Sequence, residues 1–133
     1  MDGHLLDKIS TAMVHLAKEH GGKGPTKTQT HWAGQDALVV IMGGGFTTSE
    51  ETIYRGGHGE EVRDSRHAFN DVMEGNMRTT IEGLTGRAVS AFISGTHQDP
   101  DLTVLLFVLE PEGSDGPGGP RGPTPPRFTR EAP

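Results

Sequence analysis

The sequence predicts a small α+β protein in which two β-hairpins form a four-stranded antiparallel sheet with the helices packed on one face. Periodic apolar positions predict helices and strands in the order α-β-β-α-α-β-β. Short turn segments join the strands within each pair, which favours hairpins. Strands and helices do not alternate one by one, so a doubly wound nucleotide-binding fold is not expected.

The first helix is predicted from apolar residues at three- and four-residue steps: Leu5, Leu6, Ile9, Met13 and Leu16. Gly21 and Gly22 can take the left-handed conformation that closes a helix, and Pro25 prevents the helix from restarting.

The first hairpin follows directly. Its strands are predicted at Thr26–Trp32 (TKTQTHW) and Ala37–Met42 (ALVVIM), and Ala33–Asp36 (AGQD) is read as the turn between them.

A short helix should begin after the glycines at 43–45. Either Thr47 with Glu50 or Thr48 with Glu51 has the spacing of a capping box. This helix is expected to reach about Tyr54, before RGGHG at 55–59 interrupts it.

A long helix is predicted from Glu60 to the Gly86 stop, with Gly75 as a point where it could kink or divide. Its apolar face is expected to hold Val62, Phe69, Val72, Met73, Met77, Ile81 and Leu84.

The second hairpin has the strongest strand signals in the chain. Its strands are predicted at Ala88–Ser94 (AVSAFIS) and Leu102–Leu109 (LTVLLFVL), and Gly95–Asp101 (GTHQDPD) should form the loop.

The chain divides into one domain at residues 1–110 and a tail at 111–133. The tail (PEGSDGPGGPRGPTPPRFTREAP) is rich in Pro and Gly and poor in apolar residues, so we expect it to be disordered. Phe128, between Arg127 and Arg130, could serve as a short docking element, although a solvated tail is the favoured interpretation.

Composition limits the function. A net charge of -6, from 18 acidic and 12 basic residues, argues against nucleic acid as a partner. The absence of cysteine excludes disulfides, thiolate catalysis and zinc–thiolate sites. No apolar run approaches the ~20 residues that span a bilayer, so we expect a cytoplasmic protein without direct membrane insertion.

Two glycine-rich loops are candidates for binding an anion. Lys23 and Gly24 lie in GGKGPTKTQT, which fails the Walker A spacing and is also explained as a helix stop followed by a turn. Gly44 and Gly45 lead into a helix N-terminus, whose free N–H groups attract negative charge, although caps could already use those donors.

The long helix offers two further basic candidates, Arg63 and Arg66. Together with Arg78 they could form a basic stripe, but acidic residues are interleaved with them, which is typical of an ordinary charged surface.

A metal site is not expected. His97, Asp99 and Asp101 supply ligand types within five residues, but Asp-Pro is also a common turn, and no established metal-binding spacing occurs. No nucleophile arrangement is recognisable either, so we predict no catalytic residues and no cofactor.

Several segments, in this order, resemble the bacterial MpsC family, named after the sodium-translocating membrane-potential-generating protein. The resemblance covers nearly all of residues 1–110 and is carried by GKGPTKT at 22–28, ALVVIMGGGFTTSEE at 37–51, VRDSRHAF at 62–69, EGLTGRAV at 82–89 and HQDPDLTVLLFVLE at 97–110. It directs attention to the residues Lys23, Pro25, Glu51, Arg63, Arg66 and Arg87.

The resemblance implies a non-enzymatic accessory or regulatory domain that acts with an integral membrane transport protein. The alternative is a small enzyme or binding protein that holds an anionic metabolite with Lys23, Arg63 and Arg66. Short sheets with exposed edges tend to pair, so a homo-oligomer is compatible with the sequence, which does not fix the oligomeric state.

Overall fold

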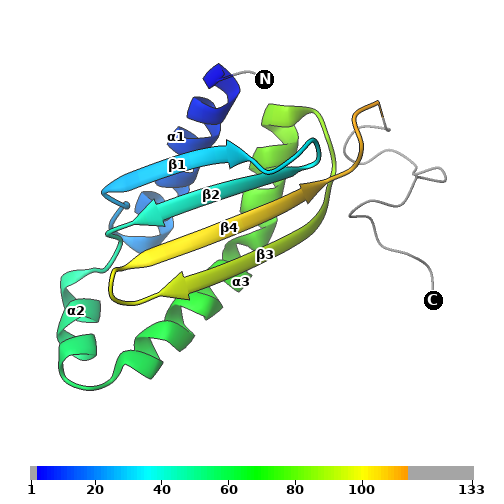
Figure 1. The fold of residues 1–133 in the computed structure, drawn as a ribbon. Helices are drawn as coiled ribbons and strands as arrows, with labels where there is room; N and C mark the ends of the chain where they lie inside the picture. Colours follow the sequence, from blue (N-terminus) through cyan, green and yellow to red (C-terminus); the bar gives the residue numbers. More distant parts are fainter. Residues whose placement is uncertain (1–2, 114–133) are drawn as a thin grey trace, which may run out of the picture.

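The computed structural model describes residues 3–113 and confirms the predicted α+β fold (Figure 1). Its four strands form one antiparallel sheet in the order β1-β2-β4-β3, so the two hairpins meet through β2 and β4. The elements are α1 (Gly3–Gly21), β1 (Lys27–Trp32), β2 (Ala37–Gly43), α2 (Thr48–Arg55), α3 (Gly59–Thr85), β3 (Val89–His97) and β4 (Leu102–Leu109).

Local signals fix the ends of the first two helices. Gly22 takes a positive φ of 84° and donates its N–H to the Lys18 carbonyl at 3.2 Å, which closes α1 where the sequence predicts. Of the two capping boxes, the structure contains the one at Thr47 and Glu50, whose side chains each accept the other residue's N–H.

The long helix α3 differs from expectation at two positions. Gly75 does not divide it, since α3 is continuous through that residue. Val72 is 82% exposed, because it lies one residue (about 100°) around the helix from Met73, outside the buried stripe. That stripe consists of Val62, Arg66, Asn70, Met73, Met77 and Ile81, of which all but Arg66 are fully buried.

The second hairpin has a longer first strand than predicted. β3 continues through Gly95 to His97, which pairs with Leu102, instead of ending at Ser94. Cross-strand pairing with β4 therefore overrides the weak strand preference of Gly95.

The core lies between the sheet and the two long helices. Figure 1 shows α1 and α3 on one side of the sheet, with α2 beyond its end. Alternate strand residues point toward the helices, and Phe107 at the centre of β4 is fully buried. The buried cluster consists of Ile9, Met13, Leu38, Val40, Met42, Met73, Met77, Ile81, Val89, Leu105, Phe107 and Leu109.

The opposite side of the sheet is not covered by any helix within residues 3–113. By the strand register, five apolar side chains meet on it, and we call them the open sheet face: Val39, Ile41, Ile93, Val104 and Leu106. Ile93 is 60% exposed and Val104 36%, while the other three are partly exposed.

The predicted disordered tail lies outside the described residues except for 111–113, and so does the docking element at Phe128. Pro111, the first residue of that tail, is buried. No helix in the described part of the chain is long and apolar enough to cross a membrane.

Candidate functional site

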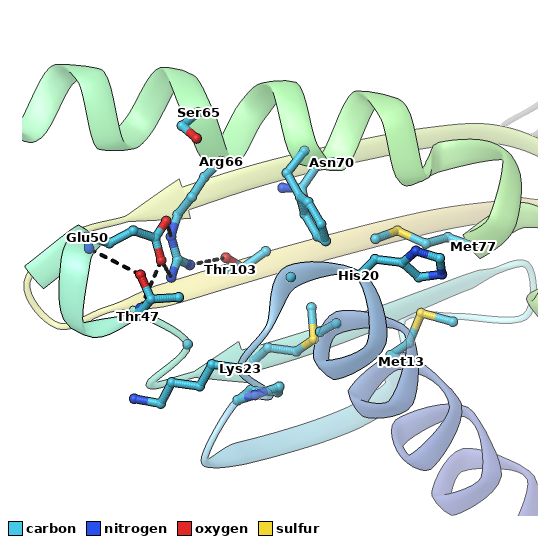
Figure 2. Close-up of a pocket in the computed structure, with 16 residues that line it drawn as sticks. Met13, His20, Lys23, Thr47, Glu50, Ser65, Arg66, Asn70, Met77 and Thr103 are labelled. Atoms are coloured by element: carbon cyan, nitrogen blue, oxygen red, sulfur yellow. Dashed lines mark hydrogen bonds and ion pairs between the residues drawn. The ribbon is translucent and has the colours of Figure 1, made fainter.

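A cavity of about 370 Å³ opens between α1, α3 and the sheet (Figure 2). Its lining comes from α1 and the loop after it, the β2–α2 segment, α3 and β4: Met13, Ala17, His20, Gly21, Lys23, Pro25, Met42, Gly45, Thr47, Glu50, Ser65, Arg66, Phe69, Asn70, Met77 and Thr103. This volume falls in the usual range for small-molecule sites.

The cavity has two chemically different ends. Figure 2 shows Met13, His20 and Met77 at one end, and Glu50, Thr47 and Arg66 at the other. An apolar region beside a polar one suits a ligand that has both kinds of surface.

Arg66 is the main cation of the polar end, and it is already paired. Its Nη1 lies 3.3 Å from Asp101 Oδ1, and its Nε lies 3.5 Å from Glu50 Oε2. The guanidinium also stacks over the Phe46 ring at 4.5 Å. Although Nε is at ion-pair distance from Glu50, this buried atom makes no hydrogen bond within the described residues.

The two carboxylates also hold the backbone of the β2–α2 loop. Asp101 accepts the Phe46 N–H at 2.7 Å, and Glu50 accepts the Thr47 N–H at 2.9 Å. Arg66 therefore connects α3 to this loop and to the β3–β4 hairpin through hydrogen-bonded anions.

Lys23 stands at the rim of the cavity. Its Nζ donates to the carbonyl of Phe46 at 2.9 Å, and the side chain is exposed. Because its partner is a neutral carbonyl, the lysine charge is not cancelled by this contact.

Asn70 lies beneath the rim and is 4% exposed. It lines the cavity from α3, between Arg66 and Met77 along the helix (Figure 2). The amide has no hydrogen-bond partner within residues 3–113, and its Nδ2 is fully buried. Sequence reasoning missed this residue, although its position on the apolar stripe of α3, three residues before Met73, was a signal.

The predicted anion-binding residues are only partly brought together. Lys23, Gly45 and Arg66 line the cavity, whereas Gly44 lines a more open neighbouring depression of about 470 Å³ that also reaches Lys23. Gly24 and Arg63 line neither of the two.

Replacing Gly44 by alanine should lower the free energy of unfolding by about 2 kcal/mol, because Gly44 has a positive φ of 75°. An added Cβ would also overlap Thr26 Oγ1. Gly75→Ala is the matched control, since a Cβ there meets no atom within 4 Å and alanine favours a helix interior by about 0.5–1 kcal/mol. Urea denaturation of both variants measures the difference. Equal effects would contradict the requirement for glycine at 44.

The residues considered for a metal have other contacts. Asp101 pairs with Arg66, and His97 Nδ1 lies 2.8 Å from the Pro100 carbonyl. Within residues 3–113, no group of three or more His, Asp or Glu side chains is placed to hold a metal ion.

Comparison with known proteins gives one match. The family model described as "Na+-translocating membrane potential-generating system (MpsC)" matches residues 1–111. No curated protein and no solved structure matches the chain. Since the family model covers most of the sequence, including every helix and strand described above, the chain belongs to the MpsC family.

Proposed function

We propose that this domain is a non-enzymatic accessory or regulatory component of a sodium-translocating membrane-potential system, and that it acts by docking on an integral membrane protein of that system. The family description supports the link to such a system. The observation that carries the docking role is the open sheet face, where Ile93 is 60% and Val104 36% exposed.

The chemistry of the open sheet face defines the partner surface. Its five members are apolar, so burying them requires an apolar surface on the other protein. Lys27 and His31 are exposed on β1, and the strand alternation turns them to the same side of the sheet. The partner should therefore present an apolar patch with acceptor or acidic groups along one border.

Ile93→Lys should abolish docking, because a lysine in the centre of an apolar contact would be desolvated without a partner. The matched control is Val72→Lys, since Val72 is an apolar residue, 82% exposed, on α3. The tagged full chain is captured from native membranes with and without a sodium gradient, and integral membrane proteins are identified by mass spectrometry. Size-exclusion chromatography with light scattering measures self-association.

Support would be one integral membrane protein that is recovered by the unmodified chain and Val72→Lys, and lost by at least about tenfold with Ile93→Lys. Recovery of no integral membrane protein under either condition would overturn the proposal. A homodimer broken by Ile93→Lys, with no membrane partner recovered, would show that the face serves self-association instead.

A second function is supported by the cavity, which collects Lys23, Gly45 and Arg66: the domain would bind an anionic metabolite. A ligand that binds the folded state raises the melting temperature. A rise that is lost on Lys23→Ala would support this function, and no rise with any anion tested would count against it.

A further inference from the structure

We infer that the cavity between α1 and α3 binds a monocarboxylate with an apolar body, which lies against methionine and phenylalanine side chains while its carboxylate is held at Asn70. This inference rests on the second proposed function, because it uses the same cavity, and it adds the chemical class of the ligand. It does not depend on docking through the open sheet face.

The apolar part of the ligand is indicated by the deeper lining. Met13, Met42 and Met77 line the cavity together with Phe69. Methionine side chains are flexible and polarizable, so they adapt to an apolar guest. A volume of about 370 Å³ is also far larger than the roughly 30 Å³ that one water occupies.

The head group is indicated by a buried donor that lacks an acceptor. Asn70 Nδ2 is buried and has no hydrogen-bond partner within residues 3–113, whereas the neighbouring Arg66 Nε already faces Glu50 Oε2 at 3.5 Å. A buried donor without a partner is destabilising, so an acceptor delivered by a ligand would restore the lost hydrogen bond. A carboxylate oxygen accepts hydrogen bonds and does not donate them, so it matches the unpartnered Asn70 donor.

The charge of the surroundings favours a single negative charge on the ligand. Glu50 and Asp101 balance Lys23 and Arg66, so the site as a whole is not strongly positive. A multiply charged phosphate would meet the two carboxylates without enough compensation. The single charge of a monocarboxylate could be compensated by the Asn70 donor and by the ammonium group of Lys23 at the rim. That ammonium group donates to a neutral carbonyl and so keeps its charge.

The test is a binding experiment with octanoate as the probe and octan-1-ol as its neutral analogue. Phosphate and citrate are tested separately. Binding is followed by the methyl resonances of the methionines in the intact chain. Octanoate should shift Met13, Met42 and Met77, which line the cavity, more than Met73, which lies in the core outside it.

Asn70→Leu should weaken octanoate binding by roughly tenfold or more while keeping or raising the melting temperature, because it removes an unpartnered buried amide. Asn76→Leu is the matched control, since Asn76 is exposed on the same helix and should leave the affinity unchanged.

Four results would overturn the inference. The first is the absence of any shift at Met13, Met42 and Met77 in the unmodified chain at millimolar octanoate, a readout that does not depend on how the variants fold. The second is equal binding of octanoate and octan-1-ol. The third is equal affinity of Asn70→Leu and the unmodified chain for octanoate. The fourth is a rise in melting temperature with phosphate or citrate alone, which would refute the ligand class and leave the second proposed function standing.

Discussion

Arg87→Met is expected to lower the free energy of unfolding by about 3–5 kcal/mol, the usual cost of removing one partner from a buried ion pair. Arg87 Nη2 lies 2.5 Å from Asp36 Oδ1, and the two side chains are 12% and 5% exposed. Arg87 also donates to the carbonyls of Gln35 and Glu110, at 3.0 Å each. Methionine would retain much of the side-chain volume but would remove the guanidinium that pairs with the buried Asp36 carboxylate.

Urea denaturation of Arg87→Met measures the loss, with Arg55→Met as the matched control. Arg55 also pairs with a carboxylate, that of Glu51 at 2.6 Å, but its side chain is 76% exposed. Exposed pairs contribute at most about 1 kcal/mol, so this control should be close to the unmodified protein. A similar small effect at Arg87 would mean that the buried pair contributes no more than a surface pair.

The fold could be predicted because its signals are local. The helix end at Gly22, the cap at Thr47 and the alternation in β2 each depend on a few neighbouring residues. The errors arose where distant contacts decide the outcome. β3 extends to His97 because β4 pairs with it. Val72 and Met73 are adjacent apolar residues on α3, and the packed structure shows which of the two is buried.

The candidate site was less predictable because its parts are far apart in the sequence. The glycine loops and Arg66 suggested an anion site, but the pairing of Arg66 with Glu50 and Asp101 joins three separate elements. Asn70 has no distinctive local motif, and its importance comes from being buried without a partner. The ion pair of Asp36 with Arg87 likewise spans 51 positions of sequence.

Phe107→Ala is expected to destabilise the protein by about 3–5 kcal/mol, because a large core side chain is removed and the surrounding residues fill the space only in part. Phe107 is fully buried at the centre of the sheet, and its ring lies 5.1 Å from that of Phe92, centroid to centroid. The loss therefore combines apolar burial with an aromatic contact.

Val72→Ala is the control for this truncation. Since Val72 is 82% exposed, its replacement should change the free energy of unfolding by no more than about 0.5 kcal/mol. Denaturation curves should keep the same slope for both variants while the midpoint falls only for Phe107→Ala. Because Phe107 points toward the helices and the open sheet face lies on the opposite side, a folded Phe107→Ala protein should still dock on its membrane partner. Loss of docking by fully folded Phe107→Ala protein would contradict the assignment of binding to the open sheet face, because stability and docking would then depend on the same side of the sheet.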